Sequence, residues 1–166
     1  MSQFRTTHRV AFTPRQMFDL VADVERYPQF LPLCEALILR KRERRGDKDV
    51  LLADMTVGYK AIKETFTSRV ELDVAGLAVH ATSVPEDPRG PFRALANDWN
   101  FLAAPGGCDV KFHIRYELKS LALEMLVGSL FDRLFRRYTL AFEARARAVY
   151  GAPPCRQAAS GRSNPD

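Results

Sequence analysis

The sequence feature that most constrains the fold is a long segment near the C-terminus, from Ser120 to about Tyr150. Apolar side chains recur in it every three or four residues, which is the spacing of one face of an α-helix. They are Leu123, Val127, Leu130, Leu134, Tyr138 and Ala141, and the stripe is widened by Leu126, Phe131, Phe135 and Phe142. Ser120 is placed to cap the helix, and Gly151 followed by prolines ends it. A helix of about 45 Å with so broad an apolar face needs a large partner, and the other helical pattern in the chain is short. We therefore expect the long helix to cover a β-sheet.

Seven segments are expected to be strands, most of them with the alternating pattern of a sheet that has one buried face. They span residues 4–12, 36–45, 50–59, 62–73, 77–84, 92–103 and 110–118. A short helix is expected after the first of them, beginning at Pro14 behind the N-cap Thr13 and ending at Tyr27 before Pro28. Short turns between strands predict an antiparallel meander covered on one side. The predicted fold class is α+β, with a curved antiparallel sheet wrapped around the C-terminal helix and a cleft between them.

Composition favours one globular domain, because 46% of the 166 residues are hydrophobic. We expect the domain to span residues 1–151 and the tail 152–166, which has few apolar side chains, to be disordered. Three widely spaced cysteines, Cys34, Cys108 and Cys155, argue against a disulfide framework and against a zinc site. The chain has neither an apolar signal core nor an apolar run near the ~18 residues of a spanning helix. A cytoplasmic protein is expected, with a peripheral position at the inner membrane as the alternative.

Catalytic motifs are scarce in this chain. It has no glycine-rich phosphate loop, no HExxH motif and no GxSxG motif. The three histidines are far apart in the sequence, and the strand pattern directs His80 and His113 toward solvent. Asp19 and Asp23 have helical spacing, but such acidic pairs usually lie on a solvated face. We therefore expect a protein without enzymatic activity, metal or catalytic cofactor.

Three polar residues fall on the apolar faces of predicted strands. Glu64 and Ser68 alternate in phase with Phe66 and Val70, and Asn97 is in phase with Trp99. Either these residues meet water near strand ends or bulges, or they line a partly polar cavity between sheet and helix. Gly128, inside the long helix, leaves room for a ligand or for close packing against Trp99. Close packing is the preferred interpretation.

Basic residues form two clusters in a chain of net charge +5. The first comprises Arg40, Lys41, Arg42, Arg44 and Arg45, and the second Arg133, Arg136 and Arg137. Each is explained by a solvated surface, and together they would suit anionic lipid headgroups or ribosomal RNA. DNA is not an expected partner. For membrane approach, we expect an exposed Phe30–Leu31 turn to act with a basic cluster.

Three stretches resemble one protein family. They are FDLVADVERYPQFLPLC at residues 18–34, residues 95–99 followed by Cys108, Val110 and Phe112, and AFEARARAVYG at residues 141–151. Together they resemble the coenzyme Q-binding family of START-like, polyketide cyclase-like domains, which also contains the bacterial ribosome-association toxin. The resemblance covers roughly residues 4–151 and implies a helix-grip fold of the START/Bet v 1 type.

The resemblance implies a non-enzymatic carrier of ubiquinone, a hydrophobic isoprenoid quinone, in support of respiratory electron transport. The quinone ring is expected among Trp99, Phe101, Phe66 and the Tyr27–Leu33 loop, with Asn97 or Glu64 bonding its carbonyl oxygens. The isoprenoid tail is expected to follow Val57, Val70, Ile114, Val127 and Phe131. The expected ligand-binding residues are Tyr27, Phe30, Leu31, Met55, Val57, Glu64, Phe66, Val70, Asn97, Trp99, Phe101, Phe112, Ile114, Leu123, Val127 and Phe131.

Two alternatives remain open from the sequence. Toxin members of the family imply an inhibitor of ribosome association that binds the large ribosomal subunit, here through the basic edge Arg40–Arg45. A cyclase-like enzyme would need an acid or base in the cavity, and Glu64 is the candidate. Fold likeness by itself assigns no reaction.

Overall fold

The computed structural model describes residues 1–153, apart from the side chain of Val127. The elements are β1 (Ser2–Val10), α1 (Pro14–Ala22), the 3-10 helix η1 (Val24–Gln29), β2 (Cys34–Arg45), β3 (Lys48–Tyr59), β4 (Ile62–Asp73), β5 (Ala78–Ser83), β6 (Phe92–Ala104), β7 (Gly107–Leu118) and α2 (Leu121–Tyr150). The order is the predicted one, with strand ends shifted by up to three residues. Most of the predicted tail, from residue 154 on, lies outside the described residues.

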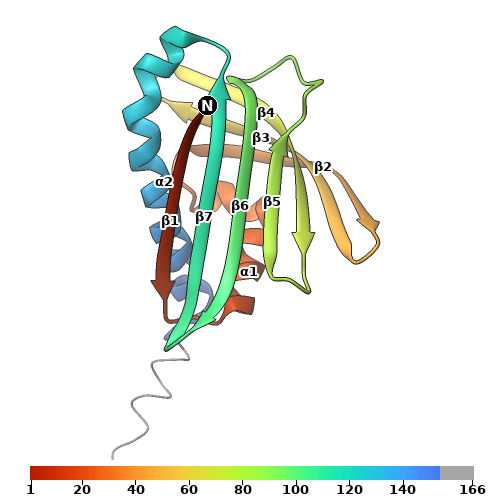
Figure 1. The fold of residues 1–166 in the computed structure, drawn as a ribbon, viewed down its shortest axis with the longest axis vertical. Coiled ribbons are helices and arrows are strands. Elements are labelled where there is room, and N and C mark those ends of the chain that lie inside the picture. The colour runs from red at the N-terminus through yellow and green to blue at the C-terminus, as the bar shows by residue number, and fades with distance from the viewer. Residues whose placement is uncertain (154–166) are drawn as a thin grey trace, which may run out of the picture.

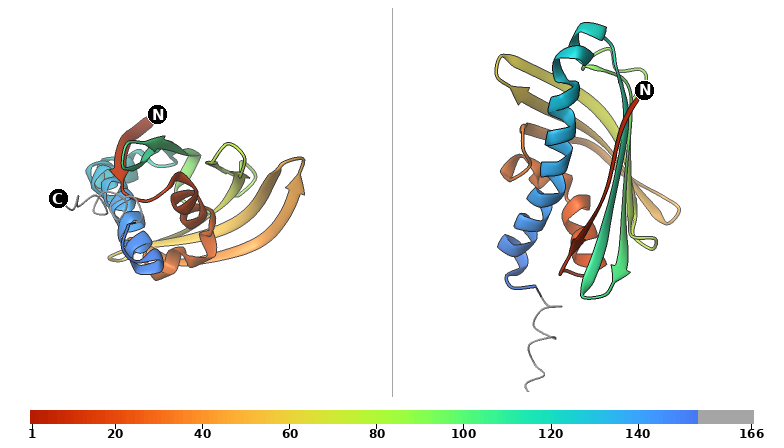
Figure 2. Two further views of the ribbon diagram at one scale, coloured as in Figure 1. Left: turned by 90° about the horizontal axis from the view of Figure 1, so that it is seen from below. Right: turned by 60° about the vertical axis from the view of Figure 1, so that its left-hand side comes forward.

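All seven strands form a single antiparallel sheet in the order β1-β7-β6-β5-β4-β3-β2. Strands β2 to β7 form the predicted meander, and β1 closes it by pairing along β7, from Ser2 opposite Tyr116 to Val10 opposite Cys108. The sheet curves around α2, and α1 and η1 close one end of the space between them (Figures 1 and 2). This is the predicted α+β helix-grip fold. The two open edges of the sheet are β1 and β2.

Local sequence sets the ends of the helices. The Thr13 side chain accepts a hydrogen bond from the Gln16 amide while the Gln16 side chain accepts one from the Thr13 amide, a complete capping box for α1. Ser120 accepts a hydrogen bond from the Leu123 amide at the start of α2, and Gly151 ends α2 with φ +77°. The predicted end of the first helix was wrong. The α-helix stops at Ala22, and the tighter η1 turn continues through Pro28, where an α-helix could not.

The core lies between the inner face of the sheet and α2. On β7, alternate residues from Cys108 to Leu118 are buried and the residues between them face outward. On α2, the inward positions include Leu134, Phe135, Phe142 and Ala146, all buried. Among the described residues no helix is long and apolar enough to span a membrane.

Two sequence predictions about α2 were wrong. Leu126 was placed in the buried stripe but is 68% exposed. It lies seven and eleven residues before Arg133 and Arg137, about two and three helical turns, and therefore on their solvent side. Gly128 does not pack against Trp99: among the described residues beyond its neighbours in the helix, no atom lies within 4 Å of where its β-carbon would be.

Candidate functional site

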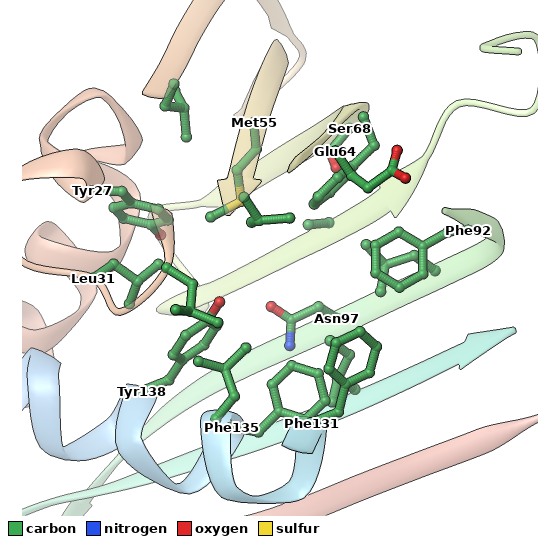
Figure 3. A pocket seen from close by; sticks show the side chains of 18 of the residues that line it. Tyr27, Leu31, Met55, Glu64, Ser68, Phe92, Asn97, Phe131, Phe135 and Tyr138 are labelled. Atoms are coloured by element: carbon green, nitrogen blue, oxygen red, sulfur yellow. The ribbon is translucent and has the colours of Figure 1, made fainter. Parts of the chain in front are cut away.

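A cavity of about 190 Å³ lies between α2 and the inner face of the sheet and is partly open to solvent (Figure 3). Its walls come from η1 and the following loop, from β2 to β7, and from α2. The lining residues are Val24, Tyr27, Leu31, Leu33, Leu37, Ala53, Met55, Val57, Gly58, Tyr59, Ile62, Glu64, Phe66, Ser68, Val70, Val79, Ala81, Pro91, Phe92, Leu95, Asn97, Trp99, Ile114, Leu123, Leu130, Phe131, Leu134, Phe135, Tyr138 and Phe142. Nearly all are apolar, so the cavity suits an apolar guest.

Twelve of the residues predicted to bind a ligand line this cavity. They are Tyr27, Leu31, Met55, Val57, Glu64, Phe66, Val70, Asn97, Trp99, Ile114, Leu123 and Phe131. The strand alternation that placed them on the inner face was therefore correct, and the sheet and helix bring them together. Whether they bind a ligand remains a prediction. The side chain of Val127 lies outside the described residues.

Three predicted residues are not in the cavity wall. Phe112 and Phe101 are buried and pack against Trp99: the ring centroid of Phe112 lies 4.6 Å from that of the indole, and that of Phe101 lies 6.3 Å from it. They hold Trp99 and do not face the empty space. Phe30 packs against Phe142 with ring centroids 5.1 Å apart. Inward parity does not distinguish a cavity wall from solid core, so contact of these three residues with a ligand remains a prediction.

The predicted exposed turn at Phe30–Leu31 is also corrected. Leu31 is only 6% exposed and faces the cavity, while Phe30 is half-buried. The guanidinium of Arg145 lies 5.2 Å from the Phe30 ring centroid and covers it. The turn is therefore part of the cavity floor and no apolar anchor projects from it.

Asn97 supplies a fixed polar group within the cavity. Its amide oxygen accepts a hydrogen bond from the indole N–H of Trp99 at 2.8 Å. Its amide nitrogen donates to the backbone carbonyl of His113 at 3.1 Å. An amide nitrogen carries two hydrogens, so one N–H remains available. Asn97 therefore offers the cavity a donor whose direction is set by Trp99.

Tyr138 supplies a second donor that the sequence prediction did not include in the site. Its hydroxyl points into the cavity on the same side as Asn97 (Figure 3). It forms no hydrogen bond with another described residue. Burial, and then the nearby Cys34 thiol, raises the pKa of Tyr138 well above its usual value of 10.0, so the hydroxyl stays protonated. The predicted stripe already contained Tyr138, but nothing in the sequence distinguished it from core positions.

Ser68 and Glu64, two further polar lining residues, lie apart from this pair. Ser68 is buried in β4, and Glu64 lies toward Phe92, away from Tyr138 (Figure 3). Glu64 and Ser68 thus support the predicted partly polar cavity over the solvent-facing alternative. Because Glu64 and Asn97 lie at different ends, they do not form one catalytic pair.

The tyrosine and cysteine groups at the closed end predict loss of stability at alkaline pH. Burial raises the pKa of Cys34 from 9.0 to about 11, and burial also raises the pKa of Tyr27 and Tyr138 above 10.0. Folding therefore favours the neutral forms, so their contribution is complete below the unfolded-state values and is lost as the pH rises. We expect the free energy of unfolding to fall above about pH 9, by up to about 1.4 kcal/mol per pH unit for each group.

Urea unfolding at about pH 8 and about pH 10 measures this effect. The variant Cys34→Ala removes one of the titrating groups, so it should lose less stability over the same interval. Equal stability of the unmodified chain at both pH values would contradict the assignment of neutral buried groups.

The first basic cluster lies on the edge strand β2. Four of its five cations are ion-paired: Arg40 with Asp54 at 2.6 Å, Lys41 and Arg45 with Glu43 at 3.4 and 2.6 Å, and Arg44 with Asp49 at 3.6 Å. Of these five cations, Arg42 alone forms no ion pair with another described residue. Charged side chains on an edge strand also discourage pairing with other sheets. The net positive field of this cluster is thus weaker than its sequence suggests.

His80 and His113 lie on the outer face of the sheet, as predicted, whereas His8 faces inward on β1 with its Nε2 3.5 Å from Glu143 of α2. His80 pairs with Asp98, and His113 lies in the same cross-strand row. Burial and then the charge of Arg5 lower the pKa of His113. Neither residue belongs to the cavity.

Comparison with known proteins agrees with this architecture. The ribosome association toxin RatA of Rickettsia prowazekii is 30% identical over 149 residues, covering 90% of this chain and 99% of the toxin. The mitochondrial coenzyme Q-binding protein COQ10 homolog B of Xenopus laevis is 28% identical over 146 residues, covering 86% of this chain and 57% of that protein. The solution structure of the 18 kDa protein CC1736 of Caulobacter crescentus has a TM-score of 0.76 and 30% identity, covering 92% of this chain and 100% of that one.

The family model described as polyketide cyclase / dehydrase and lipid transport matches residues 10–143, which include strands β2 to β7 and most of α2. The family resemblance noted in the sequence is therefore confirmed. The chain belongs to the polyketide cyclase, dehydrase and lipid transport family.

Proposed function

We propose that this chain binds the ring of an isoprenoid quinone, ubiquinone in the first instance, in the cavity and carries it without changing it chemically. The observation that carries the proposal is the pair of neutral donors, Tyr138 and Asn97, at one side of a mostly apolar cavity. A quinone ring is flat and apolar on its faces and carries carbonyl oxygens that accept hydrogen bonds. The cavity offers the complementary arrangement.

The donors match a carbonyl oxygen in protonation state as well as position. The Tyr138 hydroxyl is protonated at neutral pH and can donate, and burial raises its pKa further, so that it stays a donor at higher pH. The hydrogen bond from Trp99 already fixes the orientation of the Asn97 amide, so little side-chain entropy is lost when its free N–H binds a ligand. A carbonyl oxygen has two lone pairs and accepts from both groups.

The size of the cavity sets how much of the lipid it encloses. At about 190 Å³ it is smaller than the ~300–1,000 Å³ of pockets that enclose drug-sized ligands. The ring and the start of the tail are therefore the part that fits inside, while a long isoprenoid tail would leave through the open side. The predicted tail contacts Val57 and Phe131 line the wall along this route.

The coenzyme Q-binding relative from Xenopus laevis supports the proposal. The test is mass spectrometry of organic extracts of the purified native protein, together with titration of the protein with a short-chain ubiquinone. The chain has one tryptophan, Trp99, in the cavity wall, and a bound quinone should quench its fluorescence. Absence of quinone from the extract together with unchanged Trp99 fluorescence would overturn the proposal.

Removing one donor should weaken binding without disturbing the fold. In Tyr138→Phe the ring and its packing on Phe135 remain, but the hydroxyl is lost. We expect the affinity for ubiquinone to fall about fivefold to tenfold, the value of one neutral hydrogen bond of about 1 kcal/mol. Fluorescence titration measures the change.

Tyr150→Phe is the matched control, because its hydroxyl donates to the backbone carbonyl of Gln16 and is not among the cavity-lining groups. Equal affinity of Tyr138→Phe and the unmodified chain would remove Tyr138 from the binding site.

A second candidate function is inhibition of ribosome association through binding to the large ribosomal subunit. It is favoured by the similarity to the ribosome association toxins, which extends over nearly their full length. The proposed contact is the β2 cluster, with Arg42 as its unpaired cation. Co-sedimentation with large subunits should weaken steeply with salt and with Arg42→Gln. Failure to pellet with large subunits at low salt would exclude it.

A cyclase-like activity is the third candidate, in keeping with the name of the family. Glu64 is the one carboxylate among the described lining residues, and it lies away from the two donors. A Glu64→Gln change that leaves the function of the chain intact would eliminate this candidate.

A further inference from the structure

Apart from Met1, the large apolar side chains with the highest exposed fractions among the described residues lie on the outer side of α2. Met125 is 83% exposed, Leu121 is 74% exposed and Leu126 is 68% exposed. They lie within the first two turns of α2, where a soluble surface would carry polar residues. Three large apolar side chains gathered so closely in water indicate a surface that another apolar phase covers.

The same side of α2 carries unpaired cations. Arg133, Arg136 and Arg137 are exposed, and none forms an ion pair with another described residue. By helical spacing, Arg136 lies eleven residues after Met125 and Arg137 eleven after Leu126, so each pair shares a side of the helix. This contrasts with the β2 cluster, in which most cations are neutralised by neighbouring carboxylates.

The N-terminal half of α2, which carries the three apolar residues, also forms part of the cavity wall. Leu123 and Leu130 line the cavity from the same stretch of α2, and Tyr59 and Ile62 line it from the tip of the β3–β4 hairpin. Figures 1 and 2 place this tip across from the N-terminal half of α2. A partner that binds the start of α2 would thus lie next to the cavity wall.

We propose that Leu121, Met125, Leu126, Arg133, Arg136 and Arg137, here called the α2 docking face, bind the surface of an anionic lipid bilayer. Helices that lie in a membrane surface combine apolar side chains with basic ones in this way. Each unpaired arginine is attracted to anionic headgroups, and the apolar side chains enter the acyl boundary. RNA would use the arginines but would leave Leu121, Met125 and Leu126 in water, so the bilayer is the better match.

The docking proposal does not depend on the identity of the cavity ligand. Its test is sedimentation of the purified chain with phosphatidylcholine vesicles, with and without phosphatidylglycerol, in the absence of quinone. We expect binding to the anionic vesicles. The variant Leu121→Ser/Met125→Ser/Leu126→Ser should weaken it at least about tenfold, and Arg133→Gln/Arg137→Gln should do the same.

Two control variants make the comparison specific. Ile38→Ser/Leu102→Ser removes two exposed apolar side chains outside α2, on β2 and β6. In the unmodified chain these side chains are 63% and 46% exposed. Arg42→Gln/Arg44→Gln removes charge from β2. Both should bind vesicles as the unmodified chain does, and thermal unfolding should be similar in all variants because the changed side chains are exposed.

Three results would overturn the proposal. The first is that the unmodified chain does not bind anionic vesicles, and the second is that the α2 variants bind them as well as it does. The third is that the unmodified chain binds ribosomes but not vesicles and that Arg133→Gln/Arg137→Gln abolishes the ribosome binding. Vesicle binding by a chain that fails to bind ubiquinone would leave the docking face standing and reject only the quinone proposal.

Discussion

Replacing Ala81 with phenylalanine is expected to abolish ligand binding while making the unliganded protein more stable. Ala81 lies on β5 and faces the cavity, between Val70 on β4 and Asn97 on β6. A phenyl ring at this position would occupy the space assigned to the quinone ring. We expect the affinity for ubiquinone to fall at least about a hundredfold, equivalent to about 2.7 kcal/mol. Filling an apolar cavity should also raise stability by about 0.5–2 kcal/mol.

The opposite signs distinguish this variant from one that merely unfolds. Ala96→Phe is the matched control, since Ala96 lies on β6 one residue before Asn97 and faces the outer side of the sheet. Fluorescence titration and urea unfolding measure both effects. If Ala81→Phe bound ubiquinone as the unmodified chain does, the cavity would not be the binding site.

The fold could be predicted from the sequence because its signals are local. The stripe of α2, the cap Ser120 and the alternation along β7 each depend on residues close together in the chain. The pairing of β1 with β7 is a long-range contact, and the strand pattern did not specify it. The location of Leu126 was wrong because it shares the solvent side of α2 with Arg133 and Arg137, so the inward stripe is narrower there than its apolar sequence indicated.

The cavity wall could be predicted in part. Strand parity correctly identified inward residues such as Met55, Phe66 and Asn97. It could not tell which inward residues touch one another and which border empty space, because that depends on the separation of sheet and helix. Phe112 and Tyr138 illustrate the two errors. Both face inward, but Phe112 packs behind Trp99 and Tyr138 borders the cavity.

Charge was visible in the sequence, but its neutralisation was not. The run from Arg40 to Arg45 appears strongly basic, yet Arg40 meets Asp54 on the neighbouring strand at 2.6 Å. That pairing depends on the register of β2 with β3, which shifts between Leu39 and Lys41. The shorter second cluster on α2 keeps its charges unpaired among the described residues and is therefore the stronger electrostatic surface.

Replacing Phe142 with alanine should cause the largest loss of stability of any substitution considered. Phe142 is 1% exposed and joins three parts of the fold at the closed end of the cavity. Its ring centroid lies 5.2 Å from that of Trp99, 5.4 Å from that of Tyr27 and 5.1 Å from that of Phe30. Loss of the ring removes apolar contact from β6, η1 and α2 together. We expect the free energy of unfolding to fall by about 3–5 kcal/mol, as for other buried aromatic residues.

Urea unfolding measures this loss, and Leu140→Ala provides the control. Leu140 lies two residues earlier on the same helix but is 52% exposed, so its truncation should change stability by no more than about 0.5 kcal/mol. A loss below about 1 kcal/mol in Phe142→Ala would mean that the aromatic cluster does not hold η1 against α2. Phe142 also lines the cavity, so its removal enlarges the space at the Tyr27 end. A quinone that fills this space should recover part of the lost stability, because a ligand that binds only the folded state stabilises it.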